Sequence, residues 1–330
     1  MQLKDNFDRP IKYLRLSVTD RCNLRCFYCM PEEGIHFLPK DQLLTYEELI
    51  RVADLFMEMG VDKIRITGGE PFVRKDLIDF IAHISAYKDL NKLSITTNGI
   101  LTLPFLPQLK ELGVDQINLS LDTINEANFK KITRRNDFGK VMNTFHQMLE
   151  DGFKVKINVV VMEGINSHEI IDLARLALKY PVSVRFIEEM PFNGSNKNQS
   201  SIKWDHIRIL EELKTEFSGL KKIPTSANST SENFTFDSAL GDLGIIAAFT
   251  RTFCGSCDRI RLTSTGEMRT CLYGHNVLDI KQILREGHSD TSIKKRIIEV
   301  IKNRSKDGFE AEKLRGEQNP IGESMSIIGG

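Results

Sequence analysis

This sequence of 330 residues is notable first for what it lacks. No apolar run reaches the roughly 18 residues that a membrane-spanning helix needs, and the first ten residues, MQLKDNFDRP, contain no apolar segment of the kind found in secretion signals. Neither sign of charge is in excess, because 45 basic residues balance 45 acidic residues. These absences argue against membrane insertion, secretion and general binding to nucleic acid, and they predict a cytoplasmic protein.

Cysteine is also scarce, and its distribution is uneven. The six cysteines form two groups of three, one near the start of the chain and one near residue 260: Cys22, Cys26, Cys29, Cys254, Cys257 and Cys271. Cytoplasmic thiols stay reduced, so clustered cysteines in that compartment more often bind metal or take part in chemistry than form disulfides.

Short apolar runs alternate with helical patterns over the first part of the chain. The runs expected to be strands are residues 13–18, 63–67, 93–97, 116–121, 155–161 and 182–187. Between the first two, Thr45 and Glu48 have the spacing of a capping box at the start of a helix. Six β-α repeats predict an α/β fold with a parallel sheet, either open or curled into a partial barrel. Such sheets place active sites at the carboxyl ends of their strands.

The rest of the chain has weaker patterns. Helices are expected at residues 138–152 and 166–179, and loops at the polar stretches 191–201 and 224–238. Residues 259–269 predict a hairpin with Gly266 in its turn, and residues 276–322 are expected to be mostly helical. We therefore predict a barrel domain, 1–240, and a smaller C-terminal domain, 241–330.

The first cysteine group has the pattern C-x3-C-x2-C, with Cys22, Cys26 and Cys29. A structural zinc site needs a fourth ligand, and the nearest candidate, His36, has no metal-binding motif around it. In a [4Fe–4S] cluster, three thiolates would leave one iron open to bind a small molecule. The pattern favours the open cluster over zinc.

This group, followed some forty residues later by GGEP, resembles the radical S-adenosylmethionine (SAM) superfamily. The resemblance implies a partial (β/α)6 barrel resembling a TIM barrel, and a cluster whose open iron binds S-adenosylmethionine and reduces it to yield a hydrogen-abstracting radical. It also implies that residues at the strand ends contact this cofactor: Tyr28, Gly68, Gly69, Glu70, Thr96, Asn98, Ser120 and Met190. Gly68 and Gly69 would let the backbone approach the amino group of the cofactor.

The second cysteine group has the pattern C-x2-C-x13-C and again offers three thiolates. A zinc site with His275 as fourth ligand is the alternative. With both groups, and with LRLSVTDRCNLRCFYCMP, ITRRNDF, VRFIEEMP and FCGSCDRIRLTSTGEMRTCL, the chain is similar over most of its length to the GTP 3′,8-cyclase family. That resemblance implies two [4Fe–4S] clusters, with the second in the C-terminal domain and holding guanine.

Several cations lie between apolar residues in the expected strands. Arg15, Lys63, Arg65 and Arg185 would point into the barrel if their apolar neighbours pack against helices. Buried cations need an anion, and a polyphosphate would provide one through bidentate hydrogen bonds to arginine. The alternative is pairing with internal carboxylates such as Glu188 or Asp122.

The resemblance implies that these four cations bind the GTP phosphates or ribose, and Lys156 is a further candidate on the inward face. It assigns substrate binding and catalysis to Arg259 and Arg261, for which a solvated surface hairpin is the alternative. It also implies a catalytic role for Gly329 and Gly330, threaded into the active site, where a side chain would obstruct a tight passage. Otherwise, the two glycines would be a frayed end.

The activity implied is cyclisation of GTP to (8S)-3′,8-cyclo-7,8-dihydroguanosine 5′-triphosphate, the first step of molybdenum-cofactor biosynthesis. The implied partners are an electron donor of the flavodoxin or ferredoxin type and a downstream cyclic pyranopterin monophosphate synthase, and both a monomer and a homodimer stay open. Two rival functions are a radical SAM enzyme that modifies peptides and a non-catalytic iron–sulfur or zinc protein. Neither rival accounts for GGEP and the strand cations together.

Overall fold

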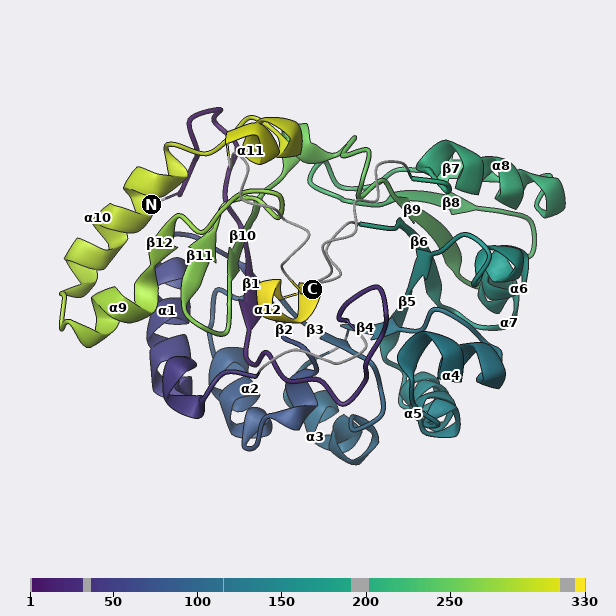
Figure 1. The fold of residues 1–330 in the computed structure, drawn as a ribbon, viewed down its shortest axis with the longest axis horizontal. Coiled ribbons are helices and arrows are strands. Elements are labelled where there is room, and N and C mark those ends of the chain that lie inside the picture. The colour runs from purple at the N-terminus through teal and green to yellow at the C-terminus, as the bar shows by residue number, and fades with distance from the viewer. Residues whose placement is uncertain (1, 32–36, 115, 191–201, 315–323, 330) are drawn as a thin grey trace.

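The computed structural model describes residues 2–31, 37–114, 116–190, 202–314 and 324–329. Their strands form one sheet in the order β12-β11-β10-β1-β2-β3-β4-β5-β6-β9-β8-β7, which bends into the open arc seen in Figure 1. From β10 to β9 neighbouring strands run parallel. These strands are β10 (Arg259–Leu262), β1 (Tyr13–Ser17), β2 (Lys63–Thr67), β3 (Lys92–Thr97), β4 (Gln116–Ser120), β5 (Lys154–Val161), β6 (Ser183–Glu188) and β9 (Asp242–Ile246).

Strands β1 to β6 are the six that the sequence predicts, and each end falls within one residue of its expected position. The chain therefore has the expected α/β fold, a parallel sheet curved as a partial barrel with helices on its convex side (Figure 1). Apolar side chains on β1 and β2 face those helices, since Leu14, Leu16, Ile64 and Ile66 are completely buried. Tyr13, Arg15, Lys63 and Arg65, on the other face, are only half-buried and point to the concave side.

The barrel helices are α1 (Tyr46–Glu58), α2 (Leu77–Ser85), α3 (Leu106–Glu111), α4 (Glu126–Thr133), α5 (Phe138–Glu150), α6 (Ile170–Ala174), α7 (Leu176–Lys179) and α8 (His206–Glu216). The capping box before α1 is confirmed: the Glu48 amide donates to Thr45 Oγ1 at 3.2 Å and the Thr45 amide donates to Glu48 Oε2 at 2.8 Å. The prediction of a single helix at residues 166–179 is wrong. A 3₁₀ turn and two short helices replace it, because the chain tightens to a Leu178–Arg175 hydrogen bond between them.

Antiparallel strands extend the parallel sheet at both ends. β11 (Glu267–Arg269) and β12 (Leu278–Asp279) follow β10, and the expected hairpin with Gly266 in its turn is confirmed. β8 (Glu232–Thr235) and β7 (Lys221–Ile223) follow β9. The expectation of a loop throughout residues 224–238 is therefore wrong, because Phe234 is buried opposite Leu243 and anchors a strand within this polar stretch. The expected loop at 191–201 lies outside the described residues.

The C-terminal helices are α9 (Ile280–Arg285), α10 (Asp290–Ile301), α11 (Gly308–Leu314) and α12 (Met325–Ile328). α9 and α10 contact α1 through the ion pairs Arg285–Glu48 and Arg51–Asp290, each 2.7 Å long. α12 lies inside the concave side of the arc, in front of β2 and β3 (Figure 1).

Residues beyond 240 complete the same sheet at both sides. β9 pairs with β6, and β10 pairs with β1, the first strand of the barrel. The division into domains 1–240 and 241–330 stays a prediction, and the sheet continues across it. No helix within the described residues is long and apolar enough to cross a membrane.

Candidate active site

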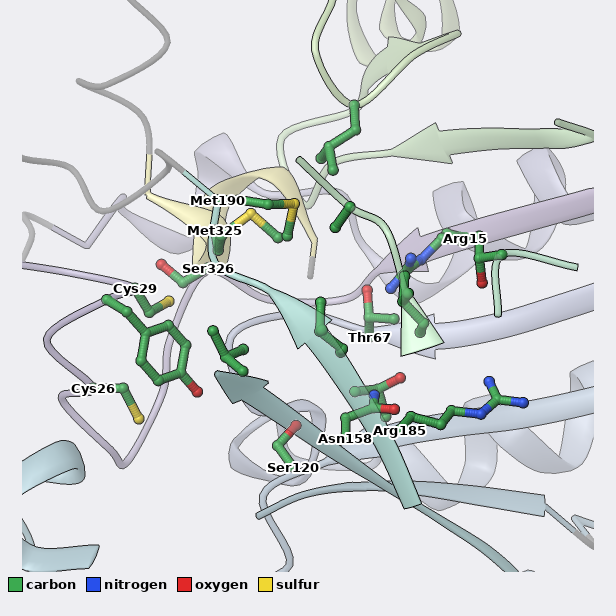
Figure 2. Close-up of a pocket in the computed structure, with 18 of the residues that line it drawn as sticks. Arg15, Cys26, Cys29, Thr67, Ser120, Asn158, Arg185, Met190, Met325 and Ser326 are labelled. Carbon is green, nitrogen blue, oxygen red and sulfur yellow. The ribbon is translucent and has the colours of Figure 1, made fainter. Parts of the chain in front are cut away.

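A cavity of about 350 Å³ occupies the concave side of the sheet. All six cysteines line it, together with arginines from β1, β2, β6 and β10. In Figure 2, Cys26 and Cys29 lie on one side of this cavity and Arg15 and Arg185 lie on the other. Two groups of three cysteines, far apart in the sequence, therefore line the same cavity as a set of arginines.

The first cysteine group lies on the loop after β1. Cys22 Sγ accepts hydrogen bonds from the Leu24 amide at 3.4 Å and from Asn98 Nδ2 at 3.8 Å. Burial raises the pKa of Cys22 to about 12 and also raises the pKa of Cys26 and Cys29, and the neighbouring Cys29 raises the pKa of Cys22 and Cys26 further. Buried thiols of this kind become thiolates when a metal cluster binds them, so the donor set fits the expected cluster.

The GGEP turn lies against the cysteine loop. A Cβ added at Gly69 would come within 2.3 Å of the Arg21 carbonyl oxygen, and one at Gly68 within 2.7 Å of the Thr19 carbonyl oxygen. The structure thus gives a reason for these glycines that the sequence interpretation did not give: they allow backbone to pack against backbone. Both still line the cavity, and their contact with S-adenosylmethionine stays a prediction.

Glu70 does not line the cavity but lies beneath it, completely buried. Its carboxylate accepts hydrogen bonds from the Asn98 amide at 2.7 Å, Thr97 Oγ1 at 2.8 Å and the Phe72 amide at 3.2 Å. Burial raises the pKa of Glu70 to about 7, although these hydrogen bonds oppose the rise. Glu70 therefore holds the loop after β3 in position, where Asn98 contacts Cys22.

The other residues expected to bind S-adenosylmethionine all line the cavity: Tyr28, Thr96, Asn98, Ser120 and Met190. The Tyr28 hydroxyl donates to Asp122 Oδ2 at 2.7 Å, which fixes its ring beside Cys29. Met190 lies next to Met325 of α12 (Figure 2). Tyr28 and Asn98 lie directly at the first cysteine group, and the expected roles of all five residues remain predictions.

The second cysteine group lies at the opposite end of the parallel strands from the first. Cys254 and Cys257 precede β10 and Cys271 follows β11, whereas the first group follows β1, which runs parallel to β10. Burial raises the pKa of Cys254 and Cys271. Burial also acts to raise the pKa of Cys257, but Arg259 and Arg304 lower it to about 7.

Neither zinc alternative gains support from the positions of the histidines. His275 is exposed and does not line the cavity, and His36 lies outside the described residues. Among the described residues, no three His, Cys, Asp or Glu side chains form a compact group around one metal ion. In a cube, by contrast, the three thiolates bind three different irons.

A row of arginines separates the two cysteine groups. Arg15 on β1 lies directly opposite Arg65 on β2 and Arg261 on β10 in the register of the sheet. Like charges in such positions repel one another. Burial and the neighbouring arginines lower the pKa of Arg15 well below its usual range, and burial and Arg259 lower the pKa of Arg261 to about 10. This arrangement is suited to binding a polyanion.

The internal carboxylates proposed as alternative partners are engaged elsewhere. Glu188 accepts from the amides of His206, Phe249 and Thr250 at 2.7 to 2.8 Å. Asp122 accepts from Tyr28 and from the Val160 amide at 2.8 Å. No ion pair joins either of these two carboxylates to an arginine within the described part of the chain, so Glu188 and Asp122 are not the partners of the strand cations.

The remaining expected cations differ in position. Arg185, Arg259 and Arg261 line the cavity, so the hairpin arginines do not form a solvated surface. Lys63 and Lys156 do not line it: Lys63 lies 4.0 Å from Asp258 Oδ2 with its side chain 34% exposed. Lys156 lies near Arg185 and Lys92, and burial with these neighbours lowers its pKa to about 7.

The C-terminal segment enters the cavity region. Arg261 Nη1 donates to the Gly329 carbonyl at 2.9 Å, and a Cβ added at Gly329 would lie 2.8 Å from Ser17 Cβ. The tight passage expected around Gly329 is thus confirmed, and Gly329 is not a frayed end; its catalytic role stays a prediction. Gly330 lies outside the described residues.

Several further residues line the cavity that were not predicted from the sequence. Tyr13, Thr67 and Asn158 lie two positions from Arg15, Arg65 and Lys156 on the same strand faces. Strict alternation would therefore have found them. Arg251 also lines the cavity, but it lies in a loop at φ +57°, and no periodic signal indicated it.

Comparison with known proteins gives two family matches that divide the chain. Residues 16–177 match the model described as the Radical SAM superfamily, and residues 182–309 match the one described as Molybdenum Cofactor Synthesis C. The GTP 3′,8-cyclase of Desulforamulus reducens is 40% identical over 302 residues, which cover 91% of this chain and 93% of that protein.

Molybdenum cofactor biosynthesis protein 1 of Mus musculus is 41% identical over 292 residues, or 88% of this chain and 46% of that protein. The chain thus spans about half the length of that relative. The crystal structure of SuiB from Streptococcus suis has a TM-score of 0.63 at 14% identity, covering 96% of this chain and 77% of that one. This similarity concerns the fold alone.

Proposed function

This chain belongs to the GTP 3′,8-cyclase family within the radical SAM superfamily, and we propose that it cyclises GTP to (8S)-3′,8-cyclo-7,8-dihydroguanosine 5′-triphosphate. The reaction would be the first step of molybdenum-cofactor biosynthesis, in accordance with the second family match. The single observation that carries this proposal is the cavity with three thiols at each end and a row of arginines between them.

The arginines would hold the triphosphate. Arg15, Arg65 and Arg261 lie side by side across three strands, and Arg185 joins them from the far side of the barrel. Arg65 is oriented by a 3.3 Å hydrogen bond from its Nε to Ser94 Oγ and by its position 5.5 Å from the Tyr13 ring centre. An oriented guanidinium group can donate two parallel hydrogen bonds to two oxygens of one phosphate. Such bidentate binding fixes the orientation of the substrate and also contributes binding energy.

The two cysteine groups would each hold a [4Fe–4S] cluster, Cys22, Cys26 and Cys29 at one end and Cys254, Cys257 and Cys271 at the other. When bound, the first cluster and S-adenosylmethionine would supply hydrogen-atom abstraction from the ribose 3′ position. S-adenosylmethionine would be positioned by residues at the strand ends: Tyr28, Gly68, Gly69, Thr96, Asn98, Ser120 and Met190. Glu70 would support the loop that carries Asn98. A substrate held by the central arginines would then lie between the two clusters.

Gly329 and Arg261 would act together on this substrate. The hydrogen bond between them brings the C-terminal segment to Ser17 and Thr67 at the ends of β1 and β2. The segment also contacts the first cysteine group, since Ser324 Oγ donates to the Cys29 carbonyl at 2.7 Å. It would exclude water from the space around the reacting sugar.

The wider setting of the reaction follows from the same proposal. An electron donor of the flavodoxin or ferredoxin type would reduce the first cluster, and a cyclic pyranopterin monophosphate synthase would consume the product. Both steps would take place in the cytoplasm.

The direct test uses GTP deuterated at the ribose 3′ position. Anaerobic protein reconstituted with iron and sulfide would receive dithionite, S-adenosylmethionine and this GTP, and mass spectrometry would follow 5′-deoxyadenosine. We expect deuterium in the 5′-deoxyadenosine together with an isomer of GTP. Undeuterated 5′-deoxyadenosine with unchanged GTP would reject GTP as the substrate while retaining the radical chemistry.

A matched variant tests the first cysteine group separately. Cys26→Ser should abolish cleavage of S-adenosylmethionine, because two thiolates do not hold the cluster with its open iron. Normal cleavage by this variant would refute the assignment of the first site. The variant should retain the iron signal of the second group, which shows that the rest of the protein is folded.

A further inference from the structure

The second cysteine group has a charged neighbour that the sequence analysis did not indicate. Arg304 follows α10 and comes from a part of the chain without recognised motifs, 47 residues beyond Cys257. Its side chain is only 3% exposed. A buried guanidinium needs acceptors for its hydrogen bonds and a counter-charge, so its surroundings identify its role.

Arg304 donates hydrogen bonds to both the side chain and the backbone of Cys257. Its Nη2 donates to Cys257 Sγ at 3.0 Å, and its Nη1 donates to the Cys257 carbonyl at 2.7 Å. Nη2 also lies 3.3 Å from the Arg259 carbonyl, at the start of β10. The planar guanidinium therefore fixes the Cys257 sulfur relative to the strand that carries Arg259 and Arg261.

A buried carboxylate keeps Arg304 in place. Asp5 Oδ2 lies 3.5 Å from Arg304 Nη1 and 2.6 Å from Arg9 Nε, and the Asp5 side chain is completely buried. Arg9 in turn donates to the Cys254 carbonyl at 3.2 Å and to the Ser305 carbonyl at 2.9 Å. One carboxylate thus orients two guanidinium groups, and each of them binds a residue of the second cysteine group.

The charges in this network do not balance without the sulfur. Arg9 and Arg304 carry two positive charges and Asp5 carries one negative charge. Another buried carboxylate of this region, Asp258, forms its ion pairs with Arg259 and Lys63 instead. A thiolate at Cys257 would neutralise the surplus positive charge, as a cluster ligand would.

The donors recorded at the first cysteine group are different. Cys22 accepts from a backbone amide and an asparagine, and Cys29 lies 3.9 Å from the Ser324 hydroxyl. All of these groups are uncharged. A charged donor at a cluster thiolate stabilises the more negative, reduced form of the cluster, because reduction potential depends on net charge and on hydrogen bonds to the sulfurs.

We propose that Arg304 is a positioning residue that holds Cys257 as a hydrogen-bonded thiolate ligand and raises the reduction potential of the second cluster. The inference rests on the proposed function, since it takes a cluster at the second cysteine group as given. It assigns the two clusters different electronic roles. The charged donor gives the second cluster, at the end of the cavity remote from S-adenosylmethionine, a higher potential than it would have without Arg304.

The test is a redox titration followed by electron paramagnetic resonance on the full chain with both clusters reconstituted. We expect Arg304→Gln to reduce the ratio of reduced to oxidised second cluster about tenfold at a fixed potential, which corresponds to about 59 mV for a one-electron couple. The first cluster in the same sample should not change. Arg304→Lys, which keeps the charge but not the paired hydrogen bonds, should recover part of the difference.

Arg296→Gln is the matched control, because it removes the same charge from an exposed position on α10. It should leave both potentials unchanged. Equal second-cluster potentials in wild type and Arg304→Gln would overturn the inference, as would equal shifts of both clusters. If Arg304→Gln binds too little iron to titrate, Arg304→Lys decides the question, and a wild-type potential in that variant with wild-type line shape would overturn the inference.

Failure of the proposed function gives a different result. A wild-type protein without any second iron–sulfur signal would overturn the proposed function and this inference together. A protein with two clusters and a shifted second potential, but without conversion of GTP, would retain the inference and reject only the substrate.

Discussion

At the scale of single residues, Lys156 does not line the cavity but lies near Arg185, which does, and this proximity links substrate binding to pH. Burial, Arg185, Lys92 and Arg65 lower its pKa to about 7. A bound triphosphate would favour the charged form and raise that pKa again. Above pH 7 the free side chain is neutral, so binding must take up a proton there, and the affinity should fall as the pH rises from 7 to 9.

We therefore expect the affinity for GTP to fall by up to about tenfold per pH unit above 7, beyond any change shown by Lys156→Arg. Arginine keeps its charge over this range, so the variant removes the titration but not the cation. Isothermal titration calorimetry in buffers of different ionisation enthalpy would measure both affinity and proton uptake. Identical pH profiles for the two proteins would contradict the prediction.

Gly329 combines a close contact with a strained conformation. It has φ +81°, and an added Cβ would lie 2.8 Å from Ser17 Cβ and 3.2 Å from Thr67 Oγ1. Gly329→Ala should therefore displace the C-terminal segment and break the hydrogen bond to Arg261. Hydrogen exchange at the amides of residues 327 to 329 should become at least tenfold faster.

Gly287→Ala is the control for this prediction, since Gly287 has φ +79° and nothing within 4 Å of an added Cβ. It introduces the same backbone strain, about 1 kcal/mol, without the contact. It should lower the free energy of unfolding but leave exchange in the C-terminal segment unchanged. Equal exchange in both variants would show that the passage around Gly329 is not tight.

The sequence indicated residues that repeat within strands and missed those held by tertiary contacts. Alternation alone directed Arg15, Arg65 and Arg185 inward, as the structure has them. Arg304 reaches Cys257 from a segment with no periodic signal, because the fold brings the two together across 47 residues. A charge that is buried only by distant contacts has no local pattern by which it can be predicted.

At the scale of elements, the turn after β2 depends on two glycines that pack against the first cysteine loop. A Cβ at Gly69 would meet the Arg21 carbonyl oxygen at 2.3 Å, the Arg21 carbonyl carbon at 2.6 Å and the Asp20 carbonyl oxygen at 2.9 Å. All three are backbone atoms, which cannot move without shifting the loop that carries Cys22. Gly69→Ala should therefore destabilise the protein by about 3 kcal/mol and reduce iron binding at the first group.

Gly139→Ala provides the matched control. Gly139 lies near the start of α5 with nothing within 4 Å of an added Cβ, so alanine should stabilise the helix by about 0.5 to 1 kcal/mol. Urea denaturation would measure both variants, and iron analysis with the spectrum of the first cluster would follow the site. Wild-type stability and iron content in Gly69→Ala would show that the loop adapts to a side chain.

Strands with long apolar runs were predicted well from the sequence, whereas a polar strand and the pairing of distant strands were not. β1 to β6 repeat a simple pattern and were predicted to within one residue. β8 consists of the polar sequence Glu232–Thr235, and one buried aromatic, Phe234, together with pairing to β9 makes it a strand. The pairing of β10 with β1 joins residues 246 positions apart, and no local sequence property could indicate it.

At the scale of the whole molecule, the sheet determines which parts of the chain can fold alone. The predicted barrel domain, residues 1–240, contains β1 to β6 but lacks β9 and β10, which cover its two edges. It would also lose completely or nearly completely buried side chains at those edges: Leu243, Ile245, Ile260 and Leu262. Unpaired parallel edges expose backbone hydrogen-bonding groups and favour aggregation.

We therefore expect the fragment 1–240 to aggregate or to unfold without a cooperative transition, whereas the full chain should unfold in one cooperative step. Calorimetry and ¹H–¹⁵N correlation spectra of the two proteins would measure this difference. A fragment ending at residue 275 is the internal comparison, because it restores β9, β10 and β11 and both covered edges. It should regain part of the spectral dispersion, because both edges of the barrel are paired again, although it loses the core side chains of α9 and α10, among them Ile280, Ile293 and Ile297. A well-folded fragment 1–240 would show instead that the division at residue 240 separates two independent domains.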